Sequence, residues 1–279
     1  TAAAINTLMG NEGNAGDKVN LDGNFTVTVD AGSASAAHLN TINGKTTSLV
    51  TATAVTALTG TAASINTLVG NEGNAGDKVD LDADYTATIS DTDVAASVLN
   101  DLNANVPGLI TATNVTNITG TAAAINTLMG NEGDSGNKIN LDGNFTVTVD
   151  AGSVAAAHLN TISGKTTGLV TATAATTITG TAAAINTLVG DEGDSGDKVN
   201  LDTDFAVTVA AGSASAAHLN AINAKTTNLV TATDVTNITG TAAAINTLMG
   251  NEGNAGDKVN LDGNFTVTVD AGSASAAHL

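Results

Sequence analysis

The chain has 279 residues and a net charge of −19, with 27 acidic residues, eight lysines and no arginine. This balance excludes a nucleic-acid partner, which requires a basic face, and the absence of cysteine excludes disulfides and thiolate metal sites. No apolar run approaches the roughly 18 residues of a membrane-spanning helix, so we expect no membrane insertion. Aromatic residues make up only 2% of the chain, and the abundance of alanine predicts a thin, closely stacked core.

A phrase of the type TAAAINTLMGNEG begins at residues 1, 61, 121, 181 and 241, which gives a period of 60 residues. Residues 1–39 and 241–279 are identical, whereas the copies between them differ, so we infer a 240-residue super-repeat. We therefore expect residues 1–279 to form one continuous repeat array. Because the chain stops within a unit, we also expect it to be an excerpt of a longer chain.

The first full period contains strand and helix signals in turn. NFTVTVD (24–30) alternates with a period of two, which is typical of a strand. SAAHLNTI (35–42) follows and places Ala36, Leu39 and Ile42 on one stripe of a short helix, with Ser33 as the expected N-cap and Gly44 as its stop.

The next half-unit repeats this pattern. AASINTLV (62–69) has the stripe Ala62, Ile65 and Leu68, with Thr61 as the expected N-cap. We expect Gly70 to end its helix as a C′ glycine, as Gly44 does for the helix before it, and Gly10 is the matching structural position of the first copy. Further along, GLITA and VTNITG within 108–120 are rich in β-branched residues and predict two short strands.

Each period therefore divides into two related half-units. Residues 27–44 align without a gap under residues 53–70. A recurring asparagine marks each half-unit at spacings that alternate between 34 and 26 residues, at Asn6, Asn40, Asn66, Asn100 and Asn126. We expect these asparagines either to bond neighbouring backbone in a buried ladder or to occupy a solvated helix position.

A unit of this size cannot bury its own apolar stripe, whereas stacked copies can. The sequence therefore predicts a β-solenoid or α/β solenoid, with short strands and one short Ala-rich helix per half-unit of 26–34 residues. Two strand spacings of about 4.8 Å equal one helix spacing, which favours a straight array. The alternative is an all-β parallel β-helix.

The acidic loop NEGNAGDKVNLDG (11–23) is the first candidate site. Glu12, Asp17 and Asp22 supply hard oxygen ligands that suit Ca²⁺, although their spacing is not that of an EF-hand. The alternative is a solvated loop that keeps the protein soluble.

Other polar residues give weaker signals. His38 recurs as His158, His218 and His278, but Val98 takes the matching place, which favours packing over metal binding or pH sensing. The second copy alone contains Tyr85 and Pro107, with Asp91, Asp93 and Asp101 nearby; an enzyme would need such a unique place, and drift is the alternative. No phosphate-binding loop or nucleophile elbow is present, so we predict no enzymatic activity and no cofactor.

The stretch ISDTDVAASVLNDLNANVPGLITATNVTNITGTAAAIN (89–126) resembles a repeat of very large bacterial, especially cyanobacterial, surface and secreted proteins. The resemblance implies an extracellular structural, adhesive or filament-forming role and transfers no catalytic residue. We thus predict an extracellular rod or filament that stacks on further copies of itself. The alternative is an adhesin stalk or a calcium- or glycan-binding surface module.

Overall fold

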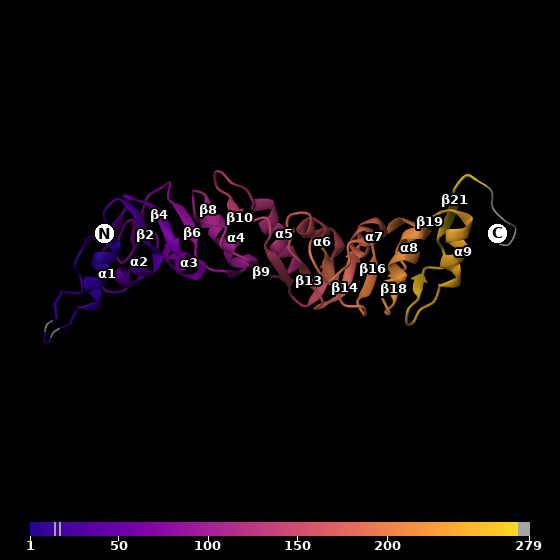
Figure 1. Ribbon diagram of the computed structural model, residues 1–279, viewed down its shortest axis with the longest axis horizontal. Coiled ribbons are helices and arrows are strands. Elements are labelled where there is room, and N and C mark those ends of the chain that lie inside the picture. Colours follow the sequence, from indigo (N-terminus) through magenta and orange to yellow (C-terminus); the bar gives the residue numbers. More distant parts are fainter. Residues whose placement is uncertain (14, 17, 273–279) are drawn as a thin grey trace. The chain divides into compact units, whose positions relative to one another are not determined.

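The computed structural model describes residues 1–13, 15–16 and 18–272. Within them, short helices alternate with short strands along the chain (Figure 1). The contacts group this chain into two compact units. The first contains Thr1–Ile118 and Gly130–Asp142, and the second contains Thr119–Met129 and the chain from Gly143 onward.

The helices have eight to ten residues each. They are α1 (Ala2–Gly10), α2 (Ala36–Asn43), α3 (Ala62–Gly70), α4 (Ala96–Asn105), α5 (Ala122–Asn131), α6 (Ala156–Ser163), α7 (Ala182–Gly190), α8 (Ala216–Asn223) and α9 (Ala242–Gly250).

The strands have two to six residues. They are β1 (Val27–Thr28), β2 (Gly32–Ser35), β3 (Val50–Ala52), β4 (Val55–Gly60), β5 (Val79–Leu81), β6 (Thr86–Ile89), β7 (Asp93–Ala95), β8 (Ile110–Ala112), β9 (Asn117–Gly120), β10 (Ile139–Leu141), β11 (Thr146–Val149), β12 (Gly152–Ala155), β13 (Val170–Ala172), β14 (Ala175–Gly180), β15 (Val199–Leu201), β16 (Ala206–Val209), β17 (Gly212–Ser215), β18 (Val230–Ala232), β19 (Val235–Gly240), β20 (Val259–Leu261) and β21 (Thr266–Val269).

Strands pair in parallel with strands of the next half-unit. The first unit contains a sheet in the order β10-β8-β6-β4-β2, and the second contains the order β12-β14-β16-β18-β20. In the first of these sheets, Leu58 pairs with Ala87 and Ala87 with Ile110, which lie 29 and 23 residues further along. Neighbours in sequence belong to different sheets, since β3 pairs with β1 and β5 whereas β4 pairs with β2 and β6. Each half-unit therefore depends on the next one for its backbone hydrogen bonds.

The core consists of the predicted helix stripes and the inward positions of the strands. Ala36, Leu39 and Ile42 of α2 are buried, as are Ala62, Ile65 and Leu68 of α3. In β11 the burial alternates residue by residue, with Val147 and Val149 inside. These stripes and this alternation confirm the sequence predictions, as do the two strands β8 and β9.

The helix ends agree only in part with the predictions. Thr61 caps α3, because its side chain accepts the Ser64 backbone N–H at 3.1 Å. Ser33 is not a cap: it pairs with Ala57 inside the sheet, and α2 begins three residues later. Serine is compatible with the strand, so the cap signal misplaced the start of this helix.

The predicted C′ glycines differ in outcome: Gly44 directly follows the last residue of α2, whereas Gly70 does not take the matching place after α3. Gly10 and Gly70 are the last residues of α1 and α3, and Asn71 with φ −98° follows the second of them. The glycine that the backbone does require lies at the junction from strand to helix. Gly180 has a φ of +144°, and an added Cβ there would lie 3.7 Å from the Ala156 side chain of the preceding helix. The positive φ, which residues with a side chain rarely adopt, explains the glycine at this position.

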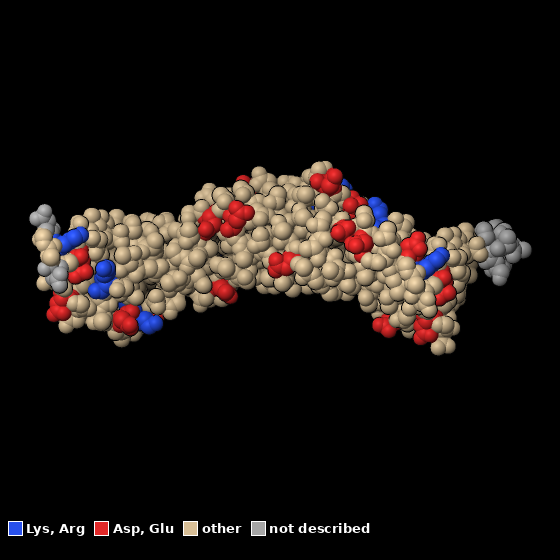
Figure 2. Space-filling model, turned by 90° about the horizontal axis from the view of Figure 1, so that it is seen from below, with Lys and Arg blue, Asp and Glu red and all other residues tan. Residues whose placement is uncertain are grey.

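The structure thus contains a repeated α/β arrangement of short helices and parallel strands. The all-β alternative is wrong, since a helix occurs in every half-unit up to α9. On the face shown in Figure 2, acidic side chains are scattered and basic ones are fewer. None of the described helices is long and apolar enough to cross a membrane.

Candidate functional site

The contact between consecutive helices contains a recurring asparagine bond. Asn40 of α2 donates from Nδ2 to the Ser64 carbonyl of α3 at 2.8 Å. Asn160 and Asn220 of the second unit donate in the same way to Ala184 and Ala244 at 2.9 Å. The asparagines of these helices therefore bond the backbone of the next helix.

The matching asparagines of the alternate helices α1, α3 and α5 bond differently. Among the described residues, the side chains of Asn6, Asn66 and Asn126 make no such bond, although all three are partly buried. Asn100 has a bonding partner. The carboxamide oxygen of Asn40 is buried without a hydrogen-bond donor, which reduces what this residue contributes to stability.

A second recurring contact joins the loop after one helix to a phenylalanine that lies just before a strand. Thr46, only 5% exposed, donates its hydroxyl to the Phe25 carbonyl and accepts the Ser48 N–H at 3.1 Å. Thr166 bonds the Phe145 carbonyl in the same way and accepts the Gly168 N–H at 3.0 Å. The threonine hydroxyl therefore links a backbone carbonyl that precedes the helix to a backbone N–H of the loop that follows it.

The lysine before this threonine forms an ion pair across two half-units. Lys45 Nζ lies 3.7 Å from Glu12 Oε2, and Lys225 Nζ lies 3.4 Å from Glu192 Oε2. Glu12, one of the predicted calcium ligands, is thus paired with a lysine.

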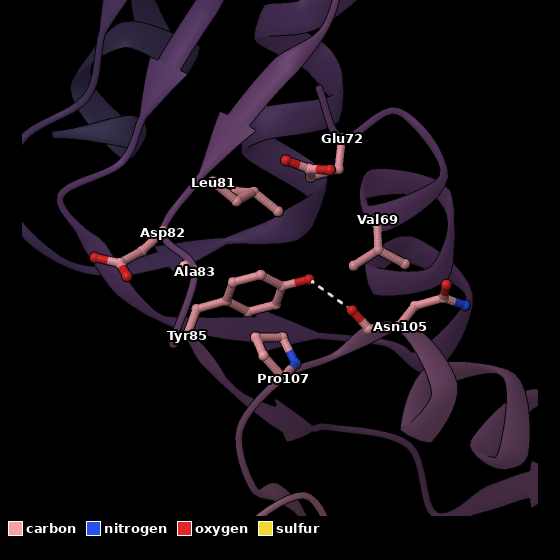
Figure 3. Close-up of a pocket in the computed structure, with 8 residues that line it drawn as sticks. All are labelled: Val69, Glu72, Leu81, Asp82, Ala83, Tyr85, Asn105 and Pro107. Atoms are coloured by element: carbon pink, nitrogen blue, oxygen red, sulfur yellow. Dashed lines mark hydrogen bonds between the residues drawn. The ribbon is translucent and has the colours of Figure 1, made fainter. Parts of the chain in front are cut away.

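The second copy has a pocket of about 330 Å³ in this region, formed within the first unit (Figure 3). Val69 comes from the end of α3, and Leu81 from the end of β5. Tyr85 precedes β6, and Pro107 lies between α4 and β8, next to the Tyr85 ring. The remaining lining residues are Glu72, Asp82, Ala83 and Asn105.

Tyr85 replaces the phenylalanine of the other copies and is 4% exposed. Its hydroxyl donates to the Asn105 carbonyl at 3.3 Å. Burial, and to a smaller extent the charge of Glu72, raise the pKa of Tyr85 to about 12. The phenol is therefore neutral at physiological pH, and a buried hydroxyl of this kind does not serve as a general base.

Glu72 lacks the lysine that its counterparts bind. The residue that matches Lys45 is Asn105, and its Nδ2 turns back to the Asp101 carbonyl at 2.7 Å. In Figure 3 the Asn105 carboxamide points away from the pocket, whereas the Glu72 carboxylate lies on the Leu81 side of it. Asp82 accepts the Asp84 N–H at 3.0 Å and points away from the Tyr85 ring. Among the described residues, no lysine pairs with the Glu72 carboxylate, which faces the pocket.

The sequence had singled out Tyr85 and Pro107, and the structure brings them together. Sequence reasoning missed Glu72 and Asn105, although an alignment of residues 45–48 with 105–108 would have shown the exchange of lysine for asparagine. The nearby aspartates lie elsewhere: Asp91 accepts the Ala62 N–H at the start of α3 at 2.7 Å, and Asp93 accepts from Asn117 at 3.1 Å.

The other predicted sites do not converge. Asp17 and His278 lie outside the described residues. Within the described part of the chain, no group of three or more His, Cys, Asp or Glu side chains is placed to hold a metal ion. His38, His158 and His218 are half-buried on their helices.

Comparisons of the chain with protein-family models, with curated proteins and with solved structures gave no match. The functional argument therefore depends on the residues and contacts described above.

Proposed function

We propose that this protein is a structural repeat protein, a solenoid whose stacked half-units extend an extracellular rod or filament. One observation supports the proposal most strongly. Thr47, Thr167 and Thr227 donate their backbone N–H groups to residues 23, 143 and 203 at 2.8–2.9 Å, so the same contact joins successive half-units in both compact units. When the backbone hydrogen bonds of each half-unit are completed by its neighbour, the stack can be extended by further copies.

The chemistry of the surface fits this role. The high net negative charge favours solubility over nonspecific association, and the helices and strands bury small aliphatic side chains in a recurring pattern. The partner that the repeated stacking contacts imply is a further copy of the same repeat. We place the protein outside the cell on the resemblance of residues 89–126 to bacterial surface repeats.

Electron microscopy of the native material, together with sedimentation of the purified chain, tests the proposal. We expect uniform thin fibres in the native material and a strongly elongated particle in solution; compact globular particles in both would contradict it. A fibre that forms only with Ca²⁺ would favour the alternative of a calcium-binding surface module.

A matched pair of variants links the fibre to the stacking contacts. Leu219→Asp places a charge at a fully buried position of α8, whereas Ala221→Asp places the same charge at an exposed position of the same helix. We expect the first variant to shorten or abolish the elongated particle and the second to leave it unchanged. Equal behaviour of the two would show that these contacts do not determine assembly.

A further inference from the structure

Two copies of the repeat hold a lysine ammonium beside this glutamate, whereas the second copy has an asparagine in place of the lysine. Glu12 and Glu192 each bond a lysine within 4 Å, and both Glu132 and Lys165 of the third copy have partners. In the second copy the lysine is Asn105, whose amide is bonded to its own helix. The carboxylate of Glu72 is more exposed than those of Glu12 and Glu192.

The residues around Glu72 can accommodate both the charge of an alkylammonium ion and its alkyl chain. Val69, Leu81 and Pro107 present apolar surface, and the ring of Tyr85 lines the same pocket. An alkyl chain can cover such apolar surface while its charged end stays at the rim, as lysine side chains do. A cation near an aromatic ring gains further attraction.

We propose that the pocket of the second repeat binds a primary alkylammonium group, such as a lysine side chain or a small amine, with Glu72 as counterion. Tyr85 and Pro107 form the wall against which the alkyl chain packs. The inference is independent of the filament proposal, because it concerns one copy of the repeat and uses no contact between molecules.

The chain provides its own probe of this pocket. Tyr85 is the only tyrosine and there is no tryptophan, so tyrosine emission reports on this site alone. We titrate the full chain with n-butylammonium at neutral pH and 150 mM salt, and use n-butanol as the uncharged control. We expect a saturable change in emission with n-butylammonium, with a dissociation constant on the order of millimolar for one exposed ion pair and a short chain, and no saturation with n-butanol.

Three variants separate the site from general attraction to an acidic protein. Glu72→Gln should weaken binding by about fivefold or more, since it removes the counterion. Glu192→Gln removes the same charge from a carboxylate that Lys225 already bonds, and it should leave binding unchanged. Asn105→Lys restores the internal ammonium and should block the added amine. Circular dichroism of each variant checks that it is folded.

Several results would overturn the proposal. These are an emission change that does not saturate, equal binding of n-butylammonium and n-butanol, equal effects of Glu72→Gln and Glu192→Gln, and unchanged binding in a folded Asn105→Lys variant. Because none of these readouts depends on assembly, their failure is distinct from failure of the filament proposal.

Discussion

In the first and second copies of the repeat, the carbonyl of the aromatic residue and an N–H of the loop after the helix are hydrogen-bonded in different ways. In the first copy, the Thr46 hydroxyl donates to the Phe25 carbonyl and accepts the Ser48 N–H. In the second, Val106 replaces the threonine, and the Gly108 N–H donates directly to the Tyr85 carbonyl at 3.1 Å. A hydroxyl lost from the loop is thus matched by one gained on the aromatic ring, which bonds the Asn105 carbonyl.

The difference shows that several neighbouring residues of the second copy have changed together. The end of α4 follows the same logic: Ala104 replaces Gly44, the helix extends to Asn105, and Pro107 prevents further extension. The core leucine beneath is equally buried in both copies, as Leu39 in the first and Leu99 in the second, and Leu159 of the third copy is buried to the same extent. Local hydrogen bonds can therefore be rewired while the stacking contacts are kept.

The largest effect should come from the shared core. Leu99→Ala and Leu159→Ala each remove a fully buried side chain and should cost about 2–5 kcal/mol in the free energy of unfolding. Urea unfolding followed by circular dichroism measures this cost. Thr161→Ala, at an exposed position of α6, is the control. A cost that differs strongly between the two leucines would show that the cores of the two copies are not equivalent.

Removal of the threonine hydroxyl should lower the free energy of unfolding only where the hydroxyl joins two backbone groups. Thr166→Val leaves the Phe145 carbonyl and the Gly168 N–H without this partner and should destabilise the protein by about 1–3 kcal/mol. Val106→Thr in the second copy should gain little, because Gly108 already bonds the Tyr85 carbonyl. The same unfolding assay compares them, and a neutral Thr166→Val would refute this interpretation.

The titration of Tyr85 tests the environment of the pocket. Ultraviolet absorbance should give a pKa of about 12 in the folded protein, above the usual value of 10.0. Because the folded state holds this proton more tightly than the unfolded state, the contribution of Tyr85 to stability should be fully present below pH 10 and be lost as the pH rises toward 12.

Glu72→Gln sharpens this measurement. The variant should lower the pKa of Tyr85, because the carboxylate raises it. The pKa should nevertheless stay above 10.0, since burial is the larger cause. A Tyr85 pKa that does not change would mean that the Glu72 carboxylate does not act on the phenol.

The smallest effect should come from the ion pair that the second copy lacks. Lys225 and Glu192 are both substantially exposed, so Lys225→Ala should cost at most about 1 kcal/mol, and less at high salt. Unfolding at two salt concentrations measures it. A cost of several kcal/mol would show that this pair is a principal element of the stack.

Several features of the fold could be predicted from the sequence because they depend on local periodicity. The stripe of Ala62, Ile65 and Leu68 and the alternation in β11 follow from which residues are apolar. The strand order could not be predicted, because neighbouring strands such as β3 and β4 join different sheets. Ser33 and Gly70 were misplaced because serine tolerates a strand and glycine tolerates a helix end.

The pocket was predictable only through its unusual residues. Tyr85 and Pro107 are conspicuous because no other copy contains them. Glu72 is present in every copy as glutamate, so its lack of a cation becomes visible only when Asn105 is placed beside it. To recognise a site that is defined by a missing partner, both the alignment of the copies and the structure are needed.

The central claim is that a half-unit cannot hold its shape alone and is stabilised by copies of itself. Urea unfolding of residues 121–180, 121–240 and 1–240 tests it directly, because these fragments contain one, two and four periods. We predict that the single period is unfolded or barely stable and that the free energy of unfolding rises with each period added. A single period as stable as the four-period chain would contradict the account.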